Sequence, residues 1–478
     1  MRYEEDLKNL FEATFNEKVV KYDYINSDGS ARKILRLFSN NRTVVGVWGP
    51  DKKENLAFVK FSYFFKNNNL PVPEIYAFDE KKQIYLETDL GDKTLFSFLR
   101  EKRNSAEFPL EVKELYKKAL KYLALFQVNA FVNFDFSFCY PRKEFDEQSM
   151  MWDLNYFKYY FLKLGGISFD EQKLEDDYKN LVNFMKDAPR NFFLYRDFQS
   201  RNIMVKDGNL FFIDYQGGRK GFLAYDVASL LYDAKAEIPP KTRNELLEYY
   251  LNIDCIKKVV DRSVFLKYYY SFVYIRLMQA MGAYGLRGFY ERKPHFLTSV
   301  PYVIKNIEWL VSNVELEIKL PELIKVLKRI TTSSYLRQFA DKKMGLNLRI
   351  YSFSYKDGFP KDNQGHNGGF VFDARCLSNP GRDPYYVDMT GKDRDVILFF
   401  EKNEGVQKYF KNCLSLVNQA VDNYLSRNFT ELYVAFGCTG GRHRSVYLAE
   451  KLYQEFSHRE NVRCHLRHLT LESEKTLK

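Results

Sequence analysis

The sequence predicts a two-lobed α+β fold, strand-rich in its first lobe and helical in its second, followed by a separate α/β domain with a largely parallel sheet. Three observations support this prediction. A chain of 478 residues is too long for one ordinary core. Strand patterns dominate the first ~90 residues, and helical patterns dominate most of 110–335. Near residue 340 a fresh strand begins, and strands then alternate with helices.

The first domain is expected to span residues 1–335. The runs KILRLFS (33–39) and RTVVGVWG (42–49) are β-rich and flank Asn40–Asn41, which predicts a hairpin. Residues 53–69 show the apolar spacing of a helix, and strand patterns return after them. This region therefore forms the strand-rich lobe, and the helical patterns beyond it form the second lobe.

The second domain is expected to span residues 345–478, with the boundary between 325 and 345. The runs LRIYSFSY (348–355), GFVFDAR (369–375) and ELYVAFG (431–437) have strand character. Helical patterns follow the second and the third of these runs. Strands that alternate with helices predict a largely parallel sheet.

Composition and charge exclude several classes of protein. Hydrophobic residues make up 45% and charged residues 28%, which is a globular composition. No run approaches the roughly 18 apolar residues of a membrane span, and the charged start MRYEEDLKNL is no secretory signal. We therefore expect a cytoplasmic protein without a membrane partner.

The six cysteines show no C-x-x-C spacing, which disfavours zinc or a disulfide framework. The net charge of +11 fits either an anionic partner or a lysine-rich surface.

The stretch FFLYRDFQSRNIMVKDGNLFFIDYQGG carries the strongest chemical signal. Asp197 is followed five residues later by Asn202, and Asp214 lies twelve residues beyond that, after a turn at Asp207–Gly208. This spacing is typical of phosphoryl transfer, in which one carboxylate takes the proton of the acceptor while an amide oxygen and a second carboxylate hold Mg²⁺. Each residue alone is more often a turn, cap or strand-end residue. The three together favour catalysis.

This block resembles the aminoglycoside phosphotransferase and choline kinase superfamily. RDFQSRN and IDYQGGRKGFLAYDVASLL are similar to the bacterial anomeric kinases of N-acetylmuramate and N-acetylglucosamine. The resemblance covers roughly residues 1–330. It implies a protein-kinase-like two-lobed fold, ATP and Mg²⁺ as cofactors, Asp197 as the catalytic base, and Asn202 and Asp214 as metal ligands.

The same resemblance places the nucleotide between two segments. SDGSARKILRL (27–37) matches the loop over the ATP phosphates, and LETDLGD (86–92) matches the hinge that holds adenine through its backbone. The residues expected to bind ATP are Ser30, Arg32, Glu87, Asp89 and Leu90.

Two features depart from the superfamily. Tyr195 stands where the family commonly has His, at a mainly structural position. No lysine ends TVVGVWG, where protein kinases place the lysine that binds phosphate. The candidates for that charge are Arg32, Lys33 and Lys60, and a degraded pseudokinase is the alternative.

The resemblance also covers Asp226, which matches a position that in the superfamily supports the catalytic loop.

The acceptor can be narrowed from the residues beside the motif. Aminoglycosides are polycations, and no acidic cluster accompanies the motifs. Gln216 and Arg219 lie just past the metal ligand and suit a neutral or anionic hydroxylated ligand, such as a sugar with an acetamido or lactyl group. An amino sugar is therefore the expected substrate, while Arg219 fits a surface charge equally well.

A glycine-rich loop, AFGCTGGRHRSV, lies near the end of the chain. It fails the Walker A pattern because no Gly–Lys pair follows Gly437. Cys438 and Arg444 obey the C-x₅-R spacing of cysteine phosphatases, for which Asp373 or Asp388 would be the general acid. A turn that only caps a helix is a further alternative. We favour a non-catalytic anion site built from backbone N–H groups and two arginines. Its expected residues are Cys438, Thr439, Gly440, Gly441, Arg442, His443, Arg444 and Ser445.

The region from about 345 to 470 resembles the C-terminal domain of RapZ, the RNase adapter protein. GCTGGRHRSVYLAEKL, YSFSYKDGFP and FVFDARCLSNPGRDPYY carry the resemblance. It implies binding of an amino-sugar metabolite, such as a sugar phosphate or a UDP-sugar, and in some members small RNA. Glu472 and Glu474 interrupt the basic residues at the end of this chain, which argues against RNA.

Together these features predict an ATP- and Mg²⁺-dependent kinase of an amino sugar, acting at the anomeric hydroxyl in cell-wall sugar metabolism, with a C-terminal sensor domain. The alternatives are a non-catalytic adapter that binds metabolite and RNA, or a kinase of the same superfamily for another small alcohol.

Overall fold

The computed structural model describes residues 2–25, 31–103, 107–340, 345–360, 369–426 and 429–476. The chain divides into two compact units. They comprise Met1–Phe296 with Leu316–Leu323, and Leu297–Glu315 with Ile324–Lys478.

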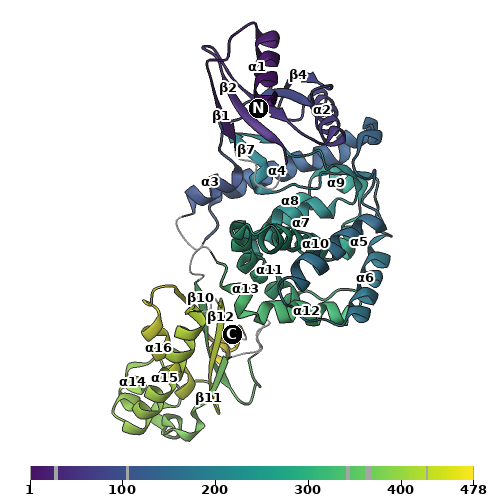
Figure 1. The fold of residues 1–478 in the computed structure, drawn as a ribbon. Helices are drawn as coiled ribbons and strands as arrows, with labels where there is room; N and C mark the ends of the chain where they lie inside the picture. Colours follow the sequence, from purple (N-terminus) through teal and green to yellow (C-terminus); the bar gives the residue numbers. More distant parts are fainter. Residues whose placement is uncertain are drawn as a thin grey trace. The chain divides into compact units, whose positions relative to one another are not determined.

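The first unit opens with an antiparallel sheet between two helices. These elements are α1 (Arg2–Phe15), β1 (Lys21–Ile25), β2 (Lys33–Phe38), β3 (Thr43–Trp48), α2 (Lys52–Asn67), β4 (Ile75–Asp79) and β5 (Ile84–Thr88). The strand order is β1-β2-β3-β5-β4 (Figure 1). On one face α1 buries Leu7 and Phe11 among side chains of β2, β3 and β5. On the other, Phe58 of α2 stacks on Tyr85 of β5. The predicted β2–β3 hairpin is confirmed, whereas α1 was not predicted.

Helices form the second lobe of this unit, as expected. They are α3 (Leu95–Lys102), α4 (Leu110–Ala124), α5 (Glu147–Tyr156), α6 (Glu171–Met185), α7 (Ala224–Leu231), α8 (Pro240–Leu251), α9 (Asp254–Val259) and α10 (Arg262–Gly285). Helix α10 packs against α5 and α7. It also packs against the helical segment Phe157–Lys163 that continues α5, and Gly285 permits this approach, because a Cβ there would lie 2.1 Å from the backbone oxygen of Tyr160.

Two small antiparallel sheets of two strands each carry the motif stretch. They are formed by β6 (Phe192–Leu194) with β9 (Arg219–Gly221), and by β7 (Ile203–Lys206) with β8 (Asn209–Phe212). The predicted turn at Asp207–Gly208 joins β7 to β8, and both turn residues have positive φ. The loops 195–202 and 213–218 therefore lie next to each other.

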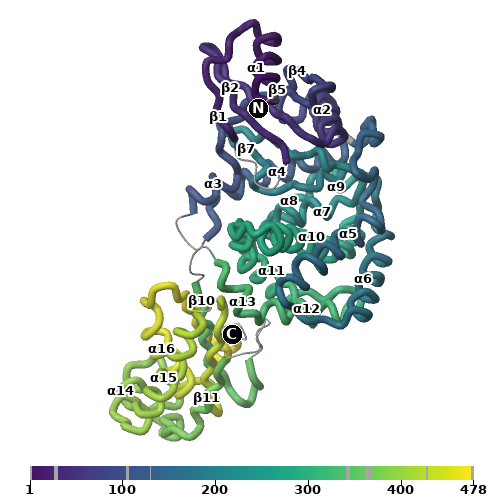
Figure 2. The backbone as a smooth tube through the Cα atoms, viewed as in Figure 1, coloured from purple at the N-terminus to yellow at the C-terminus, as the bar shows by residue number. Residues whose placement is uncertain are grey.

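The second unit contains a four-stranded sheet in which every pairing is parallel. Its elements are β10 (Leu346–Ser354), β11 (Gly369–Asp373), α14 (Arg394–Glu401), α15 (Glu404–Ser426), β12 (Glu431–Cys438), α16 (Arg444–Phe456), β13 (Val462–His468) and α17 (Leu469–Thr476). The strand order is β11-β12-β10-β13. Helices α14, α15 and α16 lie together on one side of the sheet (Figures 1 and 2). The predicted parallel sheet is confirmed, and β13 is an additional strand.

The boundary between the units differs from the expected one between residues 325 and 345. Helices α11 (Val300–Asn313) and α13 (Ser334–Arg337), together with most of α12 (Pro321–Thr332), belong to the second unit. The fully buried Arg337 forms an ion pair with Glu308 of α11. Glu308 also accepts a hydrogen bond from Thr430 at 3.3 Å, just before β12. These buried polar contacts tie the helices to the parallel sheet.

Within the described ranges, no helix combines the length and the apolar character needed to cross a membrane.

Candidate functional site

The structure brings Asp197, Asn202 and Asp214 together. The Nδ2 of Asn202 donates to the backbone oxygen of Asp197 at 2.9 Å and to Oδ2 of Asp214 at 3.1 Å. The β7–β8 hairpin makes this possible, because it returns the chain so that the N–H of Ile213 bonds to the backbone oxygen of Asn202. The three residues selected by their spacing form one cluster.

One buried carboxylate holds the loop that carries Asp197. Arg196 has φ +83° and Asp214 has φ +69°, a backbone region that is uncommon outside glycine. Asp226 of α7 is fully buried and accepts hydrogen bonds from the backbone N–H groups of Tyr195 and Arg196 at 2.8 and 2.9 Å. It also accepts one from Gln127. The supporting role implied for Asp226 is therefore what the contacts show.

Opposing electrostatic effects act on Asp197. Burial and the nearby carboxylate of Asp214 raise the pKa of Asp197, whereas Arg276, Arg196 and Arg219 lower it. The net direction is upward. A raised pKa suits a carboxylate that takes a proton from an alcohol, because its basicity is then closer to what proton transfer needs.

A cavity of about 690 Å³ lies beside this cluster and contains Arg32. Val47 lines the cavity near the end of β3, the strand on which protein kinases carry their phosphate-binding lysine. Arg32, just before β2, supplies a positive charge there: its Nη2 lies 2.8 Å from Oδ1 of Asp214 and 3.7 Å from Oε1 of Glu54. Lys60 instead packs its Nζ over the ring of Phe138.

The segment expected to hold adenine lines the same cavity through Glu87, Asp89 and Leu90. Burial raises the pKa of Glu87 to about 8, and its Oε2 has no hydrogen-bond partner in the described ranges. Asp89 lies 2.8 Å from the Nε of Arg36, which also lines the cavity. Ser30, expected over the phosphates, lies outside the described residues.

Gln216 and Arg219, the two residues expected to bind the acceptor, lie in different places. Gln216 donates to Oδ1 of Asp214 at 2.8 Å and to Oε1 of Glu54 at 3.3 Å, so it lies on the cavity side of the cluster. Arg219 is 93% buried on β9, close enough to Asp197 to affect its pKa. The structure therefore separates the two, and it does not place Arg219 on the surface.

Asp214 and Asn202 fit a magnesium ion in the chemistry of their donors. A carboxylate and an amide oxygen are hard ligands, and Mg²⁺ in phosphoryl-transfer sites commonly takes one or two protein ligands together with substrate phosphates. The described ranges contain no group of three or more His, Cys, Asp or Glu side chains placed to hold a metal. The protein thus offers two ligands, and the remainder would come from water and phosphate.

Glu54 and Arg276 were not selected from the sequence. Glu54 lies in the first turn of α2 and is identified only by its contact with Arg32, which is 22 residues earlier in the chain. Arg276 lies within a long apolar helix, where its charge alone was a weak signal.

In the second unit, the glycine-rich loop lies at the carboxyl edge of the parallel sheet, between β12 and α16. The backbone N–H groups of Gly440, Gly441 and Arg442 have no hydrogen-bond partner within the described part of the chain. Gly441 has φ +66°, and a Cβ there would lie 2.1 Å from the Oγ1 of Thr470. That hydroxyl is buried and also lacks a partner among the described residues. Such a loop at a helix N-terminus suits an anion.

The arginines of this loop are partly engaged. The Nη1 of Arg442 donates to both carboxylate oxygens of Glu474, and Arg444 donates to the backbone oxygens of Arg375 and Leu377. The Nε of each arginine is buried without a partner in the described ranges. Each arginine therefore has one buried donor available for a ligand.

The cysteine of the loop is poorly placed for phosphatase chemistry. Cys438 is 98% buried, and its Sγ lies 3.2 Å from the Oγ of Ser445. Asp373, a candidate general acid, binds Arg375 through both oxygens, which lowers the pKa of its carboxyl. The exposed Asp388 accepts a hydrogen bond from Arg442 through its backbone. His443 bonds through its ring to the backbone oxygen of Tyr386.

Two family models match the chain. Residues 22–259 match the phosphotransferase enzyme family, and residues 346–472 match the RapZ C-terminal domain. The chain joins a phosphotransferase-family domain to a RapZ C-terminal domain. The cluster of Asp197, Asn202 and Asp214 lies within the first match, and the glycine-rich loop lies within the second.

Curated relatives share only part of their length with this chain. A nucleotide-binding protein of Methylobacillus flagellatus is 38% identical over 163 residues, which are 32% of this chain and 56% of the relative. One of Nitrosococcus oceani is 38% identical over 131 residues, 27% of this chain and 44% of the relative. The chain spans about half the length of the curated relatives it matches.

Solved structures similar to this chain include two kinases. A choline kinase of Streptococcus pneumoniae has a TM-score of 0.41 and 14% identity, with 61% of this chain and 92% of that chain covered. An ethanolamine kinase of Plasmodium vivax has a TM-score of 0.43 and 14% identity, with 71% and 88% covered.

Proposed function

We propose that the phosphotransferase-family domain transfers the γ-phosphoryl group of ATP to a hydroxyl of an amino sugar, with Mg²⁺ as cofactor. The observation that carries the proposal is the cluster of Asp197, Asn202 and Asp214 beside a cavity that contains Arg32. This is the set of groups that phosphoryl transfer requires: a base, two hard metal ligands and a cation for phosphate.

Each group has one role in this scheme. Asp197 orients the acceptor hydroxyl and takes its proton as the oxygen bonds to the γ-phosphorus and the bond to ADP breaks. Asn202 and Asp214 would hold the magnesium ion, which neutralises phosphate charge when bound. Arg32 binds the phosphates in place of a lysine, and the segment of Glu87 to Leu90 holds the adenine.

The amino sugar is proposed because both parts of the chain support it. The residues beside the motif resemble anomeric kinases of N-acetylmuramate and N-acetylglucosamine. In the RapZ C-terminal domain, the N–H groups of Gly440, Gly441 and Arg442 have no partner among the described residues, which suits the phosphate of a phosphorylated or UDP-linked amino sugar. We therefore propose the anomeric hydroxyl as the acceptor in cell-wall sugar metabolism.

An acceptor panel tests the kinase proposal. The full chain, ATP and Mg²⁺ are mixed with N-acetylglucosamine, N-acetylmuramate, choline or kanamycin, and ADP release is followed. The proposal expects turnover with at least one of the two amino sugars, and a ³¹P signal of an anomeric phosphate. Turnover of choline or kanamycin alone would assign another alcohol. The absence of ATP turnover with every one of these acceptors would support a non-catalytic adapter.

A binding experiment tests the second domain separately. Calorimetry with N-acetylglucosamine 1-phosphate is expected to show binding to the wild type and to Cys438→Ser, but not to Gly441→Ala. Hydrolysis of p-nitrophenyl phosphate that Cys438→Ser removes would instead establish a phosphatase.

A further inference from the structure

Arg219 is a buried cation with few partners. It lies on β9 with 7% of its surface exposed. Its Nε donates to the backbone oxygen of Gly217 at 3.0 Å. Within the described part of the chain, no residue accepts a hydrogen bond from its Nη1 or Nη2. Buried arginines are normally paired, because an uncompensated charge away from water is costly.

The charges around Arg219 leave a positive surplus. The charged side chains near it are Arg196, Asp153 and Asp197. Arg196 and Asp153 neutralise each other through a bidentate ion pair at 2.7 and 2.6 Å, so Asp197 is the remaining carboxylate of the three. Burial and Arg196 lower the pKa of Arg219 to about 10, so its guanidinium still carries a full charge at neutral pH.

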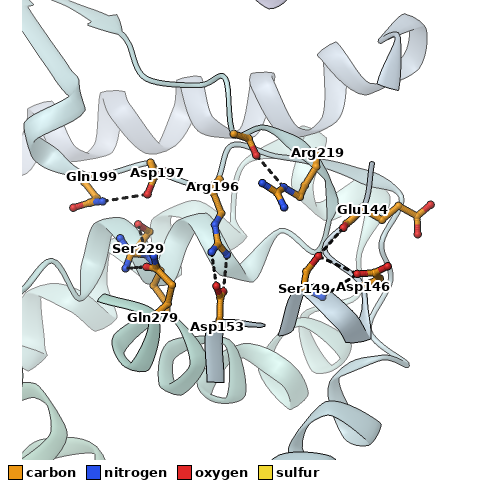
Figure 3. Close-up of polar contacts among 12 residues, drawn as sticks. Glu144, Asp146, Ser149, Asp153, Arg196, Asp197, Gln199, Arg219, Ser229 and Gln279 are labelled. Atoms are coloured by element: carbon orange, nitrogen blue, oxygen red, sulfur yellow. Dashed lines mark hydrogen bonds and ion pairs between the residues drawn. The ribbon is translucent and has the colours of Figure 1, made fainter. Parts of the chain in front are cut away.

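This surplus charge lies next to the proposed base. A Cβ on Gly217, the residue whose oxygen holds Arg219, would lie 3.9 Å from Oδ2 of Asp197. In Figure 3 the guanidinium of Arg219 points toward the side where Arg196 and Asp197 lie. Arg276, another buried arginine near Asp197, hydrogen-bonds only neutral groups of Ser229 and Gln279 among the described residues. Arg219 and Arg276 therefore both act on the one carboxylate of Asp197, and a positive charge remains in excess.

We propose that Arg219 binds a carboxylate of the acceptor, so that the substrate is an acidic sugar rather than a neutral one. The proposal rests on the kinase function and names the substrate class of the same site. The two Nη groups form a planar fork, which matches the two oxygens of a carboxylate. Binding would add a second carboxylate to the two cations, Arg219 and Arg276, that act on Asp197, and would orient the sugar hydroxyl toward Asp197.

The test uses two sugars that differ by one lactyl carboxylate, N-acetylmuramate and N-acetylglucosamine, with the full chain. KM and kcat are measured for the wild type, Arg219→Gln and Lys220→Gln. Lys220 follows Arg219 on β9, and its side chain points to the opposite face of the strand, so Lys220→Gln removes the same charge as a matched control.

The expected result is a KM for N-acetylmuramate about 10- to 100-fold below that for N-acetylglucosamine in the wild type. Arg219→Gln should abolish this preference, mainly by raising KM for the acidic sugar, while Lys220→Gln should retain it. Equal KM values for the two sugars in the wild type and in Arg219→Gln would overturn the inference and leave the kinase proposal intact.

A binding measurement decides the case in which neither sugar is phosphorylated, which would refute the kinase proposal. The melting temperature is measured with and without N-acetylmuramate or N-acetylglucosamine, in the absence of ATP. Stabilisation of the wild type by the acidic sugar alone, lost in Arg219→Gln, would uphold the carboxylate site. No stabilisation, or equal stabilisation by both sugars, would refute it. Arg219→Gln should melt no lower than the wild type, because it removes a buried charge whose Nη groups have no hydrogen-bond partner among the described residues.

Discussion

Arg32 and Glu87 line the same cavity, and burial affects the two side chains differently. Arg32 has carboxylate partners in Asp214 and Glu54 and keeps its charge. Glu87 has an unpartnered Oε2 within the described ranges, and burial raises its pKa to about 8. The sequence identified both residues as ATP-binding candidates. It left Arg32, Lys33 and Lys60 as candidates for the charge that binds phosphate. Which of these side chains enters the cavity depends on how side chains alternate along β2 and on the elements that pack beside it.

Replacing Arg32 tests its proposed role at the phosphates. Arg32→Met should raise KM for ATP about 10- to 100-fold, because charge-assisted hydrogen bonds contribute about 1.5–3 kcal/mol. Lys33→Met is the matched control, since Lys33 is exposed, and should change KM for ATP less than about threefold. Steady-state kinetics at saturating sugar checks both, and an unchanged KM in Arg32→Met would remove Arg32 from the nucleotide site.

Glu87 predicts a pH dependence of stability. The folded-state pKa of about 8 lies above the ordinary value of 4.5. Between these values the unfolded chain loses a proton that the folded chain keeps, so stability falls as pH rises toward 8. Glu87→Gln lacks this proton equilibrium. Urea unfolding at pH 5 and pH 8.5 should therefore show the variant gaining stability relative to the wild type at the higher pH. A constant difference at both values would contradict the assignment.

At the scale of elements, the local patterns predicted the hairpins and the central parallel strands, because these have clear apolar character. Helix α1 was missed, since it buries little beyond Leu7 and Phe11 amid a charged sequence. Strand β13 is an edge strand in which apolar residues alternate with polar ones such as His465 and Arg467, a pattern of a half-buried strand that was not recognised. The pairing of β7 with β8 brings Asn202 next to Asp214, and the sequence predicted the Asp207–Gly208 turn that sets this pairing.

Asp226 shows how one element positions another, and it can be tested directly. The backbone N–H groups of Tyr195 and Arg196 donate to the two carboxylate oxygens of Asp226. Asp226→Asn leaves only one oxygen to accept these two hydrogen bonds. We expect a loss of about 2 kcal/mol in the free energy of unfolding, since an unsatisfied buried N–H costs about 1–3 kcal/mol, together with a lower kcat. Asp187→Asn, at an exposed position, should stay within about 0.5 kcal/mol. Chemical denaturation measures both, and equal effects would contradict the supporting role.

At the scale of the whole molecule, the sequence predicted two folds in series, and the two compact units divide the chain at other residues than the expected boundary. The ion pair of Arg337 with Glu308 and the contact of Glu308 with Thr430 join segments far apart in the chain. Neither hydrophobic periodicity nor residue spacing predicts such contacts. Helices α11 and α13 were therefore assigned from the sequence to the helical lobe of the first domain.

Breaking this ion pair should destabilise the second unit. Arg337→Met removes the buried guanidinium that pairs with Glu308, and we expect a loss of about 3–5 kcal/mol. Arg467→Met, which breaks the exposed pair with Glu472 in the same unit, should cost no more than about 1 kcal/mol. Calorimetry measures the stability of both variants, and hydrogen exchange of the amides of β10 and β12 shows whether the second unit is the part that loses it. Faster exchange confined to the first unit would show that the boundary is misassigned.

The central claim is that Asp197 is the base of a phosphoryl transfer, and Asp197→Asn tests it most directly. A single-turnover experiment with saturating enzyme, ATP, Mg²⁺ and N-acetylmuramate or N-acetylglucosamine measures the chemical step, with ATP affinity determined in parallel. The predicted result is a rate reduced by about 10²–10⁴ with nearly unchanged ATP affinity and melting temperature. A variant that transfers phosphate at the wild-type rate would contradict the claim.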